Sequence, residues 1–300
     1  MNSIHVDYPS PNIFLCGGPY DPNNKKILSM RGAFYSDCHV SPFDEYNIII
    51  AENVSKEFQA RQDTYDNLLS LESDLAQLSS IILLFSESFG SAAELGAFCW
   101  DKDISKRLLV IISARHHDET SFVKLGPLQH LRNLHGEKSV CVIPRELCDI
   151  NNLNNNKEDA RKSLLWYIRK SFNERLETIS TKTTLNRRYK GHIILFLVGI
   201  IWHYHALDID ELHYIALECD FSVENEDIQK AMFCAIQFGW ILQISVGSRF
   251  FYVIKSEKNP LSFRRKNLSF SAREWKVDVL KFWEQADRQR YDAIKGARRR

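Results

Sequence analysis

Apolar runs alternate with amphipathic stretches through the first half of the chain. Five runs, such as "SSIILLF" and "RLLVIIS", are nearly continuous in valine, isoleucine and leucine; they cover residues 12–18, 46–51, 79–85, 107–113 and 138–144. Such runs are typical of strands covered on both faces of a parallel sheet. Helical periodicity lies between them, over residues 64–78, 91–101 and 119–134. Alternating strands and helices require crossover connections, so the pattern predicts a doubly wound α/β domain with a five-stranded parallel sheet.

The pattern changes after the fifth run. The segment "DINNLNNNKEDA" is rich in asparagine and almost free of apolar residues, which indicates a linker. Helical periodicity then covers 160–178, 189–205, 208–219 and 225–238, followed by two β-like runs around "VGSR" and a last amphipathic helix over 271–291. Three helices followed by a hairpin is the order of elements in a winged helix. We therefore expect an α/β domain over 1–150, a linker over 151–160 and a mostly α, winged-helix-like domain over 161–300.

The helix before the hairpin, "ENEDIQKAMFCAIQFGW", is acidic at its start and poor in arginine. Base readout in the major groove uses arginine, lysine, asparagine or glutamine. Two uses of the second domain therefore stay open, which are direct DNA reading and docking of a protein or a second copy.

Charge is unevenly distributed along the chain. The formal net charge is +1, but residues 261–300 hold 12 Lys/Arg against 5 Asp/Glu, so this tail carries +7 and the rest carries −6. A basic tail suggests an anionic partner, and a solvated helix face explains it equally well. The best polyanion contacts are Arg264, Arg265, Lys266, Arg298, Arg299 and Arg300.

The cysteines and the termini indicate the class of protein. Seven cysteines, none in a CxxC motif and most inside apolar segments, favour reduced thiols over a disulfide framework or a metal site. The start, "MNSIHVDYPSP", has no basic and apolar regions of a secretion signal, and the most apolar run, 192–202, is short for a bilayer span. We expect a cytoplasmic protein with no membrane attachment.

Two junctions between strand and helix hold the candidate chemistry. "CGGPYD" follows the first strand, where Gly17 and Gly18 allow close backbone approach to a ligand. "SESFGSAAELG" follows the third strand, and its S-x-x-E spacing predicts Ser91 as N-cap with Glu94 closing a capping box. Ligands of open α/β sheets bind beyond the carboxyl ends of the strands, so these junctions are expected to meet. Helix statistics alone predict that Glu72, in "LESDLAQL", is an exposed, solvated charge.

The order and spacing of "NIFLCGGPY", "LESDLAQLSSIILLF" and "SFGSAAELGAF" resemble the nucleoside deoxyribosyltransferase family. The whole chain is similar to the deoxyribosyltransferase-like effectors encoded beside bacterial retrons. The resemblance implies a flavodoxin-like first domain and N-glycosidic chemistry, in which Glu94 attacks the anomeric carbon of a ribose and expels the base. A carboxylate suits this role because the transition state resembles an oxocarbenium ion.

The resemblance also assigns roles to the neighbouring residues. Glu72 would position the sugar or base, Gly17 and Gly18 would line the pocket, and Tyr20 and Asp21 would lie near its rim. Glu87, Ser88, Gly90 and Ser91 complete the expected substrate-binding set. One departure matters, because these transferases carry an aspartate six residues before the nucleophile and this chain has Ser88 there. That favours hydrolysis of NAD or another nucleotide over base exchange, with no bound cofactor.

The resemblance further implies partners and leaves alternatives. A retron reverse transcriptase and its branched RNA–DNA molecule would restrain the toxin, which is expected to form a homo-oligomer or a higher assembly. One alternative is a non-catalytic nucleotide sensor that switches DNA or protein binding, with Glu94 only a helix cap. The other is a nucleoside deoxyribosyltransferase of salvage, which leaves the second domain unexplained.

Overall fold

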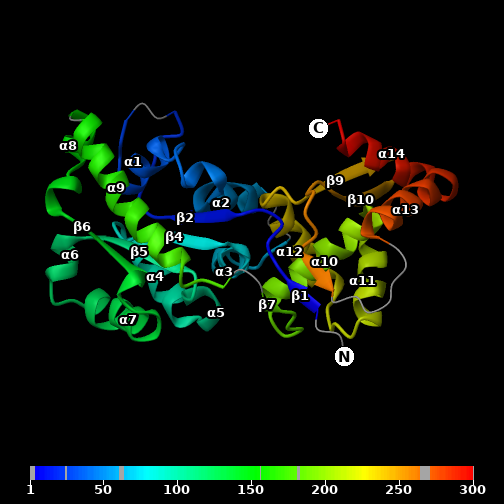
Figure 1. Cartoon of the computed structure of the whole chain (residues 1–300), viewed down its shortest axis with the longest axis horizontal. Helices are drawn as coiled ribbons and strands as arrows, with labels where there is room; N and C mark the ends of the chain where they lie inside the picture. The colour runs from blue at the N-terminus through cyan, green and yellow to red at the C-terminus, as the bar shows by residue number, and fades with distance from the viewer. Residues whose placement is uncertain are drawn as a thin grey trace. The chain divides into compact units, whose positions relative to one another are not determined.

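The computed structural model describes residues 4–23, 26–60, 64–155, 157–180, 183–263 and 271–299 (Figure 1). The chain divides into two compact units. The sheet unit comprises Pro11–Asn53 and Leu75–Ile179. The helical unit comprises Met1–Ser10, Val54–Asp74 and Ser180–Arg300. The division therefore differs from the expected boundary near residue 150, because an N-terminal segment and residues 54–74 associate with the second half of the chain.

The sheet unit is built on five parallel strands in the order β3-β2-β4-β5-β6 (Figure 1). Its strands are β2 (Asn12–Cys16), β3 (Asn47–Ile50), β4 (Ile81–Phe85), β5 (Leu108–Ser113) and β6 (Val140–Ile143). Each lies inside one of the five apolar runs, so the predicted strands are confirmed. Alternate residues of a strand point to opposite faces, and a parallel sheet needs apolar residues on both. That requirement explains the continuous runs.

Helices cover both faces of this sheet. The helices of this unit are α1 (Met30–Asp37), α4 (Phe89–Trp100), α5 (Lys102–Ser105), α6 (Ala114–Asp118), α7 (Gln129–His135), α8 (Ile150–Asn155) and α9 (Lys157–Leu176), with short helical turns at Phe43–Glu45, Lys124–Leu128, Glu137–Ser139 and Arg145–Leu147. Two more helices, α2 (Ala51–Ala60) and α3 (Leu68–Leu78), each have residues in both units. Ile13 and Leu15 of β2 share a core with Phe34 of α1 and Phe172 of α9. Phe14, between them, contacts Phe98 of α4. Side chains of β2 thus contact α1 and α9 on one face of the sheet and α4 on the other, which is the arrangement of a doubly wound domain.

The asparagine-rich segment is helical, and this differs from the expected linker. Leu153 is fully buried in the core of the sheet unit. Asn154 accepts a hydrogen bond from the Ile27 backbone N–H and donates one to the Ile27 carbonyl, at 3.0 and 2.9 Å. One buried leucine and one asparagine that satisfies distant backbone groups are enough to order the segment, and composition alone does not reveal them.

The helical unit contains the predicted hairpin and the helices predicted after residue 180, whereas the helix predicted over 160–178 is α9 of the sheet unit. Its elements are β1 (Ile4–Val6), β7 (Thr183–Thr184), α10 (Lys190–Tyr204), β8 (Ala206–Leu207), α11 (Ile209–Glu218), α12 (Asn225–Gln237), β9 (Ile241–Val246), β10 (Arg249–Ile254), β11 (Leu261–Phe263), α13 (Ala272–Ala286) and α14 (Arg288–Ala297). The hairpin strands join β8 in a sheet of order β8-β10-β9, and β1 lies between β11 and β7 in a second sheet. The sequence did not predict β1, β7, β8 or β11.

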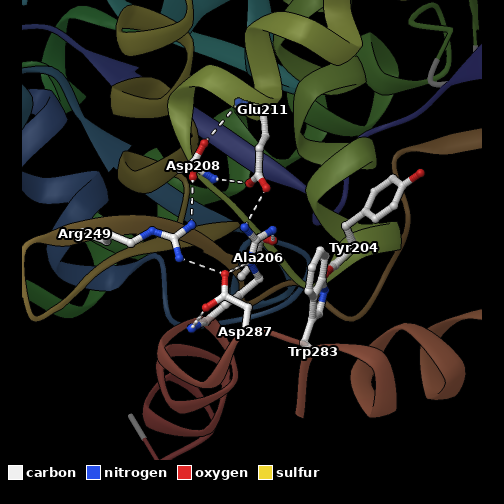
Figure 2. Close-up of polar contacts among 8 residues, drawn as sticks. Tyr204, Ala206, Asp208, Glu211, Arg249, Trp283 and Asp287 are labelled. Atoms are coloured by element: carbon white, nitrogen blue, oxygen red, sulfur yellow. Dashed lines mark hydrogen bonds and ion pairs between the residues drawn. The ribbon is translucent and has the colours of Figure 1, made fainter. Parts of the chain in front are cut away.

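The predicted last helix is two helices that meet at Asp287. This residue is the C-cap of α13 and the N-cap of α14, and its side chain accepts a hydrogen bond from the Arg290 N–H. It also accepts from the guanidinium of Arg249, which in turn reaches Asp208 at the start of α11 (Figure 2). We call Asp208, Glu211, Arg249, Asp287 and Arg290 the ionic network. It connects α11, the hairpin and α14.

No helix in the part of the chain that the structure describes is long and apolar enough to cross a membrane.

Candidate functional site

The carboxyl ends of β2 and β4 meet at the start of α1. The carboxylate of Glu87, just after β4, accepts hydrogen bonds from three backbone N–H groups: Gly18 at 3.2 Å, Met30 at 2.8 Å and Arg31 at 3.1 Å. Gly18 leaves room for this carboxylate, because a Cβ there would lie 2.9 Å from Glu87 Oε1. Burial raises the pKa of Glu87, while the three N–H groups act in the opposite direction. Glu87 therefore ties the two strand ends to α1.

Ser88, and not Ser91, is the N-cap of α4. The Ser88 hydroxyl accepts a hydrogen bond from the Ser91 N–H at 3.1 Å, and the Ser91 hydroxyl accepts from the Ser88 N–H at 2.9 Å and from the Glu87 N–H at 3.1 Å. The capping box thus begins three residues earlier than predicted, and serine replaces glutamate in it. The predicted capping role of Glu94 is wrong. Its carboxylate, one turn further into the helix, satisfies none of the first N–H groups.

Glu94 belongs to a group of charges with Arg31 and Glu52. Burial and the neighbouring charge of Glu52 raise the pKa of Glu94 to about 7, while Arg31 acts in the opposite direction. Glu52 follows β3 at the start of α2 and forms an ion pair with Nη1 of Arg31, whose side chain is only 1% exposed. The site therefore combines residues that follow three adjacent strands, β3, β2 and β4.

Polar atoms of this group lack partners. Glu94 Oε2 is buried and makes no hydrogen bond to any described residue, and the same holds for Nε and Nη2 of Arg31. Leaving a buried donor or acceptor unsatisfied costs about 1–3 kcal/mol, so such atoms favour a partner such as a ligand, an ion or an ordered water. A buried carboxylate oxygen and a buried guanidinium with free donors are suited to bind a polar substrate.

Gly17, directly after β2, brings the backbone close to Arg31. Gly17 has φ = +152°, and a Cβ there would lie 2.8 Å from Phe85 Cβ and 3.1 Å from Arg31 Cδ. Glycine thus lets the backbone approach the arginine closely. Tyr20 donates a hydrogen bond to Asn53 Oδ1 at 2.7 Å, and its ring centroid lies 5.2 Å from the Arg31 guanidinium carbon. Tyr20 therefore packs against the Arg31 guanidinium and is held there by Asn53 of α2.

A pocket of about 480 Å³ lies at the same end of the sheet. It is lined by Pro19, Leu28, Ser29, Met30, Glu87, Ser113, Arg115, His116, Arg145, Cys148, Asp149 and Ile150. Glu87 connects it to the charged group, since it binds the Arg31 N–H, although Glu94, Arg31 and Glu52 do not themselves line it. Among the residues that the structure describes, Arg115 and Arg145 form ion pairs with exposed acids, Glu119 and Asp118. Both arginines are thus available for an anionic part of a ligand.

The remaining predicted residues lie in various environments. Asp21 accepts hydrogen bonds from the N–H groups of Asn23 and Lys26 within its own loop, and Gly90 is exposed in the first turn of α4. Glu72 belongs to the helical unit and is 7% exposed, so its expected solvation is wrong. Arg298 and Arg299 are exposed at the end of α14. Arg264, Arg265, Lys266 and Arg300 lie outside the described residues.

Sequence reasoning missed Arg31 and Glu52. Glu52 directly follows the second predicted strand, so its position at the sheet edge could have been found. Arg31 lies in "LSMRGAF", a segment with no predicted element, and nothing in the sequence distinguishes it from a surface arginine. Among the described residues, no three His, Cys, Asp or Glu side chains come together as metal ligands.

Comparison with known proteins defines the class of this chain. Residues 28–243 match the family model described as "STM3845 retron effector protein". The chain therefore belongs to this family of retron effectors.

Two Escherichia coli relatives carry more specific names. The "Retron Ec86 putative ribosyltransferase/DNA-binding protein" is 28% identical over 239 residues, which is 78% of this chain and 74% of the relative. The "Retron Ec73 putative ribosyltransferase/DNA-binding protein" is 30% identical over 123 residues, which is 39% of this chain and 36% of the relative. The second match thus spans little more than a third of that relative's length.

Proposed function

We propose that this retron effector cleaves the N-glycosidic bond of a nucleotide, with NAD as the first substrate to test and Glu94 as the nucleophile. The observation that carries the proposal is the buried, unpartnered Oε2 of Glu94 beside the unpartnered guanidinium nitrogens of Arg31. The names of the relatives, which include ribosyltransferase, agree with chemistry at a ribose. The capping box of Ser88 and Ser91 removes the structural explanation that a non-catalytic sensor would need for Glu94.

The reaction follows from the position of the carboxylate. In its ionised form Glu94 attacks C1′ of the ribose and forms an ester, while the bond from C1′ to the base nitrogen breaks and its electron pair stays with the base. Nicotinamide departs from NAD as a neutral molecule, so it needs no proton. Water then hydrolyses the ester. Arg31 favours the ionised form of Glu94, and Arg115, His116 and Arg145 are placed to bind the phosphates of a nucleotide.

We also propose that the helical unit binds nucleic acid, as the relatives' names suggest for them. Its order of α10, β8, α11, α12 and the β9–β10 hairpin is that of a winged helix. In this system the partners would be the retron reverse transcriptase and its branched RNA–DNA, which restrain the effector, and the effector would act as an oligomer.

Induced expression tests the proposed reaction. The effector is expressed without its partners, and growth, NAD and released nicotinamide are measured against a Glu94→Gln strain. We expect growth arrest with loss of NAD and stoichiometric release of nicotinamide in the wild type alone. Arrest that depends on Glu94 while NAD stays intact would move the substrate to another nucleotide. Arrest that is unchanged in the variant would refute Glu94 as the nucleophile.

Burial of Glu94, together with the charge of Glu52, is expected to set the pH at which cleavage begins. The pKa of Glu94 is about 7, so kcat/KM should rise as pH increases through this value. Glu52→Gln removes a negative neighbour and frees Arg31, so the ascending limb should move to lower pH. The Glu158→Gln variant, at an exposed acid on α9, should leave the limb in place. If the ascending limb of the pH profile of kcat/KM lies at the same pH in the Glu52→Gln variant as in the wild type, a group other than Glu94 titrates.

A further inference from the structure

A second pocket lies in the helical unit, among α10, α13 and α14. It has a volume of about 510 Å³ and is lined by Trp202, His205, Ala272, Arg273, Lys276, Val277, Leu280 and Arg298. Its size is within the range of pockets that bind small molecules or single nucleotides. Residues from three helices contribute to it, and α10 and α13 lie side by side (Figure 1).

The charge of this pocket is entirely positive. Arg273, Lys276 and Arg298 contribute three cations, and none of the described residues that line it is acidic. Within the described ranges, none of the three forms an ion pair, whereas Arg249 and Arg290 elsewhere in the same unit are each paired twice. Arg298 also lowers the pKa of Lys276, after the larger effect of burial. Three cations around one pocket, with no acidic partner among the described residues, favour binding of an anionic ligand.

The walls between the cations are apolar. The Lys276 ammonium lies 3.9 Å from the centroid of the Trp202 ring, and Val277 and Leu280 extend the apolar surface along α13. Trp202 is held in place because its indole N–H donates to the Glu257 carbonyl at 2.9 Å. His205 is buried, which lowers its pKa, and its Nε2 contacts the Lys276 carbonyl at 2.8 Å. It therefore orients α13 and adds no charge.

We propose that this pocket binds a single nucleic-acid strand, with a backbone phosphate on Arg273, Lys276 and Arg298 and an unstacked base against Trp202, Val277 and Leu280. The combination of a cationic groove with aromatic and apolar surface is that of single-strand binding sites. A duplex keeps its bases stacked, so it cannot fill the apolar wall. The proposal rests on nucleic-acid binding by the helical unit, and it assigns that binding to a defined surface.

The helix expected to read DNA is a poorer candidate. α12 begins with Glu224, Glu226 and Asp227, and Glu224 and Asp227 close a capping box at its N-terminus. Negative charges at the end that would enter a groove repel phosphates. Three cations that form no ion pair with any described residue gather instead at the pocket of α10, α13 and α14.

Fluorescence anisotropy of the full chain tests the proposal with a labelled 20-nucleotide single strand. The pocket variant carries Arg273→Gln, Lys276→Gln and Arg298→Gln. The control variant carries Lys255→Gln, Lys281→Gln and Lys295→Gln, which remove the same charge from exposed positions outside the pocket. We expect at least about tenfold weaker binding for the pocket variant at 0.1 M salt. Each phosphate contact contributes about 0.7 to the salt slope of a single strand, and the proposed site holds one backbone phosphate, so the slope should fall by about 0.7.

The outcomes separate the inference from the function on which it rests. Equal losses in the two variants, or no loss in either, would overturn the pocket as the site. Equal pocket dependence for a duplex of the same length would overturn the single-strand assignment, and stronger pocket-dependent binding of polyglutamate would reassign the site to an acidic protein. If the wild type binds no nucleic acid, the proposed function of the helical unit itself fails. Cleavage of NAD by both variants is measured alongside, because neither alters the Glu94 site.

Discussion

The Glu94→Gln substitution is expected to lower the rate of N-glycosidic cleavage by about three orders of magnitude or more. Glutamine keeps the shape of the side chain but cannot form the ester with C1′, and loss of a nucleophile usually costs at least this much. The measurement is release of base from purified protein under single-turnover conditions. A residual rate above about a tenth of the wild type would show that Glu94 is not the nucleophile.

The same substitution should make the protein more stable at high pH. Because burial raises the pKa of Glu94 from 4.5 to about 7, the ionised form is disfavoured in the folded state. This cost is absent below pH 4.5, grows as the pH rises towards 7 and is constant above it. The Glu94→Gln variant avoids it, so its Tm should exceed that of the wild type at pH 8 and approach it at pH 4.5. The Glu158→Gln control should show no such difference, and an advantage for Glu94→Gln that is equal at both pH values would contradict the raised pKa.

The largest loss of stability is expected from Arg290→Met. Arg290 is 2% exposed, donates to Glu211 at 2.6 Å and to Asp287 at 3.2 Å, and lies 4.0 Å from the Trp283 ring centroid. Its removal leaves two carboxylates of the ionic network without their buried partner (Figure 2). Breaking a buried pair in this way costs about 3–5 kcal/mol. We expect the Tm to fall by at least about 6 °C.

A matched control lies two residues away on α14. Arg288 pairs with Asp292 at 3.3 Å on the exposed face, where ion pairs contribute about 0–1 kcal/mol. Arg288→Met should therefore change the Tm by no more than about 2 °C. If both variants lose similar stability, the effect would come from helix α14 itself and not from the ionic network.

The sheet could be predicted from the sequence, whereas the surroundings of Glu94, the proposed nucleophile, could not. The strands were predictable because a buried parallel strand needs apolar residues on both faces, as in β4 and β5. Glu94 was singled out by the resemblance. Its partners Arg31 and Glu52 are distant in sequence and adjacent only because β3 and β4 flank β2, and a list of strands does not specify that order.

Two wrong expectations have similar physical causes. The spacing of Ser91 and Glu94 satisfies the capping signature, yet Ser88 and Ser91 satisfy it as well when serine takes the glutamate position. The asparagine-rich segment is polar in composition, yet Leu153 is fully buried. Alternative caps differ by only about 1 kcal/mol, so the capping signature alone does not select one of them. In the asparagine-rich segment, packing of Leu153 in the core outweighs the polar composition.

The interleaving of the two units has a consequence for synthesis on the ribosome. The strand β1 is made first, but its partners are Thr183–Thr184 and Leu261–Phe263. The sheet unit needs nothing beyond Ile179, so it can fold while the rest of the chain is still being translated. The helical unit must wait for β11. The proposed glycosidic site, with Glu94, Arg31 and Glu52 all in the sheet unit, can therefore form on the nascent chain before the helical unit is complete.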